Sequence, residues 1–240
     1  MKQENWYDVD TARGGDFSLS NAFPILMRKV FVWMTLALAI TGITAYGVAS
    51  SPALVGMIFS SKVMFWGLII AEFGLVMAIS GAINRLSLAT ATLLFILYSV
   101  VNGATLSVIF LAYSTTVIAK TFFITAGTFG AMALVGYTTK TDLTSIGKLL
   151  FMALIGIIIA SVVNIFVGSS GLDLIISYVG VLVFVGLTAY DTQKIKEMCR
   201  MAPDAGESMQ KLALLGSLSL YLDFVNLFLF ILRIVGGNRE

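Results

Sequence analysis

The stretch Ser217–Gly236 reads SLSLYLDFVNLFLFILRIVG, an almost wholly apolar run with one acid, Asp223, near its middle. A helix that crosses a hydrocarbon layer of about 30 Å needs roughly 20 residues, and this run supplies them. Ser219, Asp223 and Asn226 recur at the spacing of one helical face. A carboxylate that faces lipid costs at least ~2.5 kcal/mol, so we expect this face to meet protein or water. The acid is then either a functional group or a structural one that a neighbouring helix satisfies.

The composition is that of an integral membrane protein. Of the 240 residues 58% are hydrophobic and 12% charged, and the mean hydropathy is +0.96, whereas a soluble domain carries about 25% charged residues. A single cysteine, Cys199, excludes an intrachain disulfide, and the chain has no histidine. We therefore expect any pH response to come from carboxylates. No motif predicts a cofactor, and no basic run predicts a nucleic-acid partner.

The rest of the chain predicts an all-α membrane protein with seven transmembrane helices in one domain. Residues 1–23 are polar and have no apolar core of a signal peptide, so we expect a cytoplasmic tail. The transmembrane domain is expected over residues 24–235, followed by a short tail at 236–240. Small residues four apart, such as Ala126 and Gly130, predict close helix packing. The seven apolar segments are at 24–49, 63–83, 88–113, 119–138, 146–168, 173–195 and 211–235.

Lysine and arginine are distributed unevenly between the two sides that seven spans define. Excess positive charge marks the cytoplasmic side, which predicts a cytoplasmic N-terminus and a C-terminus outside. The N-terminal side carries eleven basic residues: Lys2, Arg13, Arg28, Lys29, Arg85, Lys140, Lys148, Lys194, Lys196, Arg200 and Lys211. The other side carries four: Lys62, Lys120, Arg233 and Arg239.

Three acids lie inside the apolar segments: Glu72, Asp191 and Asp223. The sixth and seventh helices are antiparallel neighbours, so Asp191 and Asp223 can approach, although counting from the helix ends leaves them at different depths. If they meet, both cannot be ionised in a low dielectric, and the pair shares a proton and titrates as a unit. Calcium could compete with that proton, because it binds carboxylate oxygens. The alternative is that Asp191 pairs with Lys194.

Two further segments carry polar side chains on one face. Ser99, Asn102 and Thr105 lie in the third segment, and Ser161 and Asn164 in the fifth. These residues either line a polar cavity or form hydrogen bonds between helices, and the sequence leaves both interpretations open.

The motifs FVGLTAYDTQKIK (184–196) and SLYLDFVNLFLFILRIVG (219–236) resemble the Bax inhibitor-1, or transmembrane Bax-inhibitor-motif, family in its bacterial branch. The resemblance implies a fold in which the C-terminal helix is central and the other six wrap around it. It implies a pH-sensing pair of Asp191 and Asp223, latched by an arginine that matches Arg85 here. It also implies a calcium leak, with Glu72 as a candidate for the cation path. We expect Asn102, Asn226 and Tyr221 as further candidates for that path, and the two aspartates as a transient calcium site.

Two functions follow as expectations. The first is a pH-sensitive calcium leak channel in a bacterial inner membrane, with calcium and protons as its partners and no cofactor. The second is a modulator of a membrane-bound ATP-dependent protease, to which bacterial relatives are linked. Enzymatic activity is not expected: an intramembrane aspartyl protease needs Gly-x-Gly-Asp, and here Asp223 follows Leu220, Tyr221 and Leu222.

Overall fold

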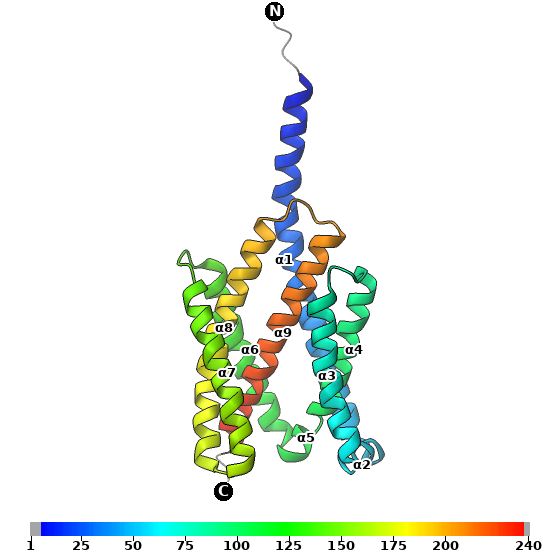
Figure 1. Ribbon diagram of the computed structural model, residues 1–240, viewed down its shortest axis with the longest axis vertical. Helices are drawn as coiled ribbons and strands as arrows, with labels where there is room; N and C mark the ends of the chain where they lie inside the picture. The colour runs from blue at the N-terminus through cyan, green and yellow to red at the C-terminus, as the bar shows by residue number, and fades with distance from the viewer. Residues whose placement is uncertain (1–5, 238–240) are drawn as a thin grey trace, which may run out of the picture.

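Helices make up almost the whole of this computed structural model, which describes the backbone of residues 6–237 and the side chains of residues 22–237 (Figure 1). No strand occurs within that part of the chain. The helices are α1 (Trp6–Ala49), α2 (Pro52–Phe59), α3 (Lys62–Ala82), α4 (Leu88–Leu106), α5 (Ile109–Ala112), α6 (Thr115–Thr138), α7 (Thr144–Val167), α8 (Ser170–Arg200) and α9 (Glu207–Gly236).

Seven of the described helical segments are long and apolar enough to cross a membrane, which confirms the predicted fold class. They cover 22–49, 62–82, 88–112, 115–138, 144–167, 170–200 and 207–236. The largest difference is between the last two spans, where a loop was expected over about 196–210. Both helices continue into that stretch, and only residues 201–206 connect them. Polar residues such as Lys196, Glu197 and Gln210 have good helix propensity. The expected spans were defined by apolar residues alone and therefore ended too early.

Serine side chains fix the beginnings of most of these helices. A serine just before a helix accepts a hydrogen bond from a backbone N–H of the first turn, a group that has no partner within the helix. Gly168 ends α7 with a φ of 66°, a left-handed conformation that glycine adopts without steric cost. The capping serines are Ser51, Ser61, Ser87, Ser114 and Ser169.

The C-terminal helix α9 is the most buried of the spans. In its most apolar stretch 61% of the residues are buried, against 6% in α3 and in α7. It packs against α1, α4, α6 and α8, whereas α3 packs mainly on α4 and α7 on α8 (Figure 1). A fully central α9 wrapped by all six other spans stays a prediction. On the outer spans the exposed side chains are large and apolar, for example Val63 at 84% and Phe166 at 85% exposure, as expected for a surface that faces lipid.

Helix α8 is placed by glycines on its two neighbours. Gly136 of α6 lies against the backbone of Ala189, and Gly147 of α7 lies against the ring of Tyr190. Both contacts lie within two residues of Asp191. The predicted small-residue pair at Ala126 and Gly130 is not where α6 packs closely, because a Cβ at Gly130 would meet nothing within 4 Å.

Candidate functional site

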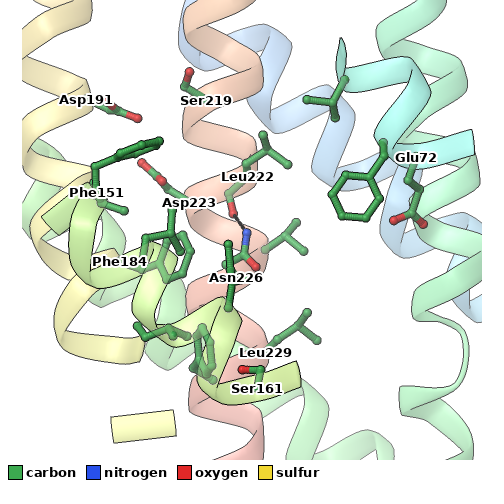
Figure 2. Close-up of a pocket in the computed structure, with 18 of the residues that line it drawn as sticks. Glu72, Phe151, Ser161, Phe184, Asp191, Ser219, Leu222, Asp223, Asn226 and Leu229 are labelled. Carbon is green, nitrogen blue, oxygen red and sulfur yellow. Dashed lines mark hydrogen bonds between the residues drawn. The ribbon is translucent and has the colours of Figure 1, made fainter. Parts of the chain in front are cut away.

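The register between α8 and α9 answers the question of depth that the sequence leaves open. Gly216 lies against Ile195, and Gly180 lies against the ring of Phe230. This antiparallel register puts Asp191 level with Ser219, as Figure 2 also shows, so that Asp223 lies one helical turn, about 5 Å, farther along α9. Two aspartate side chains can bridge that offset.

The two aspartates meet at the contact between α8 and α9. Their carboxyl groups are close enough for a side-chain hydrogen bond, and they lie beside Phe151 and Phe184 (Figure 2). Oδ2 of Asp223 is buried, and no donor among the described residues reaches it. Carboxylates only accept hydrogen bonds, so a bond between the two groups requires one of them to carry a proton.

Lys194 does not form the alternative ion pair with Asp191 among the described residues. Its Nζ lies 5.9 Å from the centre of the Tyr190 ring instead. The aromatic face gives the ammonium a favourable position at the end of the span, and Asp191 is left facing Asp223.

Both aspartates line a cavity of about 1210 Å³. Side chains of α3 and α4 form one wall and those of α7 and α8 the other, with one face of α9 between them (Figure 2). Most lining residues are apolar. The polar and charged ones are Glu72, Tyr98, Asn102, Thr105, Lys148, Ser161, Tyr190, Asp191, Lys194, Ser219, Asp223 and Asn226.

Glu72 lies across the cavity from the aspartate pair, on α3 (Figure 2). Its carboxyl group is next to the side chains of Asn102 and Thr105, and its Oε1 is buried without a hydrogen-bond partner in the described structure. The cavity therefore has two separate acidic sites, one on each wall.

The other predicted cation-path residues contribute unequally. Asn102 and Asn226 line the cavity, but the Nδ2 of Asn226 donates to the Leu222 carbonyl of its own helix at 2.8 Å (Figure 2). Tyr221 is fully buried inside the bundle, where its hydroxyl donates to Oδ1 of Asn102 at 2.8 Å. Ser161 does line the cavity, whereas Asn164 caps the end of α7 by accepting from the backbone N–H of Ser169 at 3.1 Å.

Arg85 does not touch the aspartate pair in this structure. It is exposed in the turn between α3 and α4, outside the cavity, and it forms no ion pair with any described residue. The turn is held to the start of α9: Glu207 accepts from the N–H of Leu88 at 2.9 Å, and Lys211 donates to the Leu86 carbonyl at 3.0 Å. A latch contact from Arg85 would require this turn to move.

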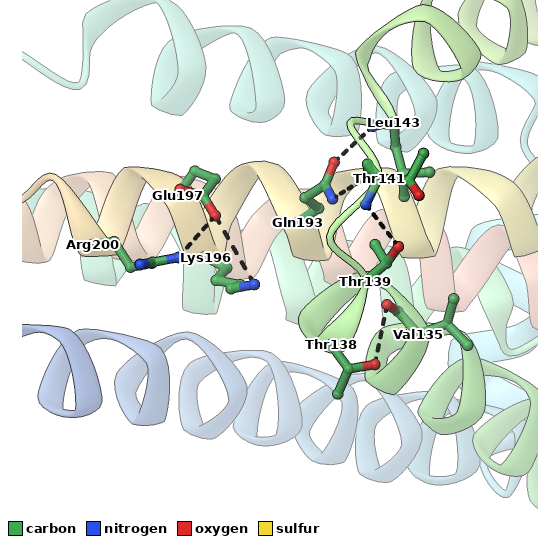
Figure 3. Close-up of polar contacts among 9 residues, drawn as sticks. All are labelled: Val135, Thr138, Thr139, Thr141, Leu143, Gln193, Lys196, Glu197 and Arg200. Carbon is green, nitrogen blue, oxygen red and sulfur yellow. Dashed lines mark hydrogen bonds and ion pairs between the residues drawn. The ribbon is translucent and has the colours of Figure 1, made fainter.

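Several residues around the site carried no signal in the sequence. Thr41 of α1 bonds the Tyr221 hydroxyl at 2.6 Å. Gln193, two residues after Asp191, accepts from the N–H of Leu143 and donates to the Thr141 carbonyl, both at 2.8 Å (Figure 3). Gln193 thereby fixes the connection between α6 and α7 to α8. Only its position beside the Tyr190-Asp191 motif could have drawn attention to it.

The aspartates alone do not make a calcium cage. No group of three potential metal ligands occurs among the described cysteine, aspartate and glutamate side chains. Calcium takes 6–8 oxygen ligands, and two carboxylates supply at most four. Two carboxylates alone therefore leave a calcium ion incompletely coordinated.

Comparison with known proteins agrees with the resemblance found in the motifs. The family described as "Inhibitor of apoptosis-promoting Bax1" matches residues 24–240. The chain is 50% identical to the inner membrane protein YbhL of Escherichia coli strain K12 over 214 residues, 89% of this chain and 92% of the relative. It is 39% identical to a membrane protein of Streptococcus pyogenes over 185 residues, 77% of this chain and 80% of that relative. The chain is therefore a multi-pass membrane protein that belongs to the Bax inhibitor family.

Proposed function

We propose that this protein is a pH-sensitive calcium leak channel whose closed state is held by the Asp191–Asp223 pair. The observation that carries the proposal is Oδ2 of Asp223, which is buried beside a second carboxyl group with no other donor among the described residues. A shared proton joins α8 to α9 at this point. Loss of the proton leaves two adjacent carboxylates, whose repulsion is strong in a low dielectric.

The cavity gives the ionised pair access to a cation. Asp191 and Asp223 line the same cavity of about 1210 Å³ as Glu72, and acids at membrane depth mark ion pathways in many transporters. A calcium ion that enters would neutralise the separated charges. In this proposal Arg85 acts as a latch only in another conformation, after the α3–α4 turn has left the start of α9.

Calcium flux into proteoliposomes across about pH 5 to 8 tests the proposal. We expect the parent protein to give a pH-dependent flux, and we expect Asp223→Asn to flatten the pH profile, because an amide cannot exchange the proton. Glu197→Gln is the matched control: Glu197 is also an acid of α8, but it is half exposed and pairs with Arg200 at 3.5 Å outside the cavity. An Asp223→Asn protein that is folded and keeps the parent's pH profile would show that the pair is not the gate.

The second candidate function is modulation of a membrane-bound protease assembly. It is favoured by the backbone of α1, which continues as a helix from Trp6 to the first span at residue 22 and projects beyond the other helices (Figure 1). Sixteen residues of helix extend about 24 Å, long enough to reach a partner at the membrane surface. Deleting residues 2–20 should alter the turnover of a protease substrate without changing calcium flux. Unchanged turnover would count against this function.

A further inference from the structure

A second buried polar cluster lies apart from the aspartate pair, where α9 packs against α1 and α4. The Tyr221 hydroxyl contacts Oγ1 of Thr41 at 2.6 Å and Oδ1 of Asn102 at 2.8 Å. The Thr41 hydroxyl also donates to the Ser99 carbonyl at 3.0 Å. Tyr221 and Ser99 are fully buried, and Thr41 and Asn102 are at most 7% exposed. This chain of hydrogen bonds joins three helices in a region from which solvent is almost excluded.

One end of this chain of hydrogen bonds lies near a titratable group, Glu72. Asn102 reaches the cavity, where its side chain lies next to the carboxyl group of Glu72. The Tyr98 and Tyr221 hydroxyls are the other titratable groups close to Glu72. The Thr105 hydroxyl, its second polar neighbour, donates to the Val101 carbonyl at 3.3 Å. The charged residues elsewhere on the cavity wall are Lys148, Asp191, Lys194 and Asp223.

The number of hydroxyl hydrogens limits which of these hydrogen bonds can form at the same time. Thr41 and Tyr221 each carry one hydroxyl hydrogen, but three contacts need one: Thr41 to Ser99, Thr41 to Tyr221, and Tyr221 to Asn102. With Oδ1 of Asn102 facing Tyr221, one contact lacks a hydrogen. A half-turn of the Asn102 amide supplies the third one, because its NH₂ group then donates to the Tyr221 oxygen.

The charge of Glu72 selects between the two amide orientations when its carboxyl group and the Asn102 amide are hydrogen-bonded to each other. Ionised Glu72 can only accept, so the Asn102 NH₂ turns toward it. Tyr221 then donates to Asn102, Thr41 donates to Tyr221, and the Thr41–Ser99 bond is lost. Protonated Glu72 donates to Oδ1 of Asn102. Asn102 then donates to Tyr221 and Tyr221 to Thr41, and the Thr41 hydroxyl is free to donate to the Ser99 carbonyl. Each set uses each hydroxyl hydrogen once and one hydrogen of the Asn102 amide.

We propose that Glu72 is a second proton-binding site. Its protonation state acts through Asn102 and Tyr221 and determines whether the Thr41–Ser99 hydrogen bond between α1 and α4 forms. The two helices are in tight contact just there, because Gly103 of α4 lies against the Thr41 backbone and the Thr44 side chain. Loss of one buried hydrogen bond changes the balance between two helix arrangements by up to about tenfold. The proposal does not depend on calcium leak.

Infrared difference spectroscopy of the reconstituted full chain tests this inference. We compare spectra on either side of the protonation of Glu72, with ring-labelled tyrosine to identify the tyrosine bands. The expected result is that a carboxyl C=O band and a tyrosine C–O band titrate together in the parent. Glu72→Gln should remove both bands, and Tyr221→Phe should remove only the tyrosine band.

Tyr98→Phe is the matched control, since Tyr98 is also a buried tyrosine near Glu72 and its ring packs 5.6 Å from that of Tyr221. It should keep both bands. Tyr221→Phe retains the ring that packs on Phe95 and Tyr98, so we expect it to fold. If it does not, Thr41→Val gives the same test, because loss of the Thr41 hydroxyl should shift the titrating tyrosine band.

A tyrosine band that does not change while Glu72 titrates, or that titrates equally in Glu72→Gln, would overturn the proposal. Neither result would bear on Asp191 and Asp223, and the calcium-flux experiment would still decide the proposed function.

Discussion

Replacing Gly136 by alanine tests how closely α6 and α8 must approach beside the aspartate pair. The new methyl carbon would lie 2.8 Å from the carbonyl carbon and 2.9 Å from the Cα of Ala189, where ordinary contacts are 3.4–4 Å. The carbonyl oxygen of Ala189 would lie closer still. The obstacle is backbone, which cannot rotate away, so the helices must separate by roughly 1 Å or more. Overpacking of this kind costs about 1–3 kcal/mol. In a chain of this size we expect a Tm lower by about 2–4 °C for each kcal/mol.

Gly130→Ala on the same helix is the matched control. Nothing lies within 4 Å of a Cβ at Gly130, so this variant should be neutral or more stable by up to about 1 kcal/mol, because alanine loses less backbone entropy than glycine in a helix. Reversible unfolding of both variants in mixed micelles, followed by circular dichroism, gives the comparison. Equal stability of the two variants would refute the claim that the α6–α8 distance is set at Gly136. Since Ala189 is two residues from Asp191, the separation should also reduce the pH dependence of calcium flux.

Three further predictions concern the ends of the helices. Hydrogen bonds from the side chain and the backbone amide of Thr144 hold the pKa of Asp142 below its ordinary value. These hydrogen bonds should therefore stabilise the α6–α7 connection at pH values above the pKa that Asp142 has in the unfolded chain. The stabilisation should be lost as the pH falls through the pKa of Asp142 in the folded protein. An NMR titration of the carboxyl carbon would detect the lowered pKa, and Asp142→Asn would remove the pH dependence. Gln193→Ala should speed amide hydrogen exchange at Leu143, because the acceptor of its N–H is lost; exchange at the parent rate would exclude the contact. Alkaline phosphatase fused to the C-terminus should be active if the C-terminus lies outside the cytoplasm, and an inactive but expressed fusion would reverse the predicted orientation.

The number and positions of the spans could be predicted because hydropathy registers each of them directly. The extensions of α8 and α9 beyond the apolar segments could not, since Lys196 and Gln210 read as a polar loop although both favour a helix. The position of Arg85 could not be predicted from the sequence either. It depends on contacts from Glu207 and Lys211, more than 100 residues farther along the chain.

The sequence draws attention to the acids that line the cavity but not to how they are arranged. An acid in an apolar run is conspicuous, so Glu72, Asp191 and Asp223 stand out in the sequence. Whether they meet depends on helix register, which is set by small residues such as Gly216 that look alike throughout the chain. Thr41 could not be recognised in the sequence, because single hydroxyl groups are common in membrane helices and can donate a hydrogen bond to a backbone carbonyl of their own helix.

The two outer walls of the cavity, α3 and α7, are the least buried spans and rest mainly on α4 and on α8, respectively. Each of these two helices therefore contacts acyl chains on its outer side and the protein on its inner side. The width between the walls then depends on the thickness and lateral pressure of the surrounding bilayer. We therefore expect the distance of Glu72, on α3, from the aspartate pair to depend on the thickness of the host membrane.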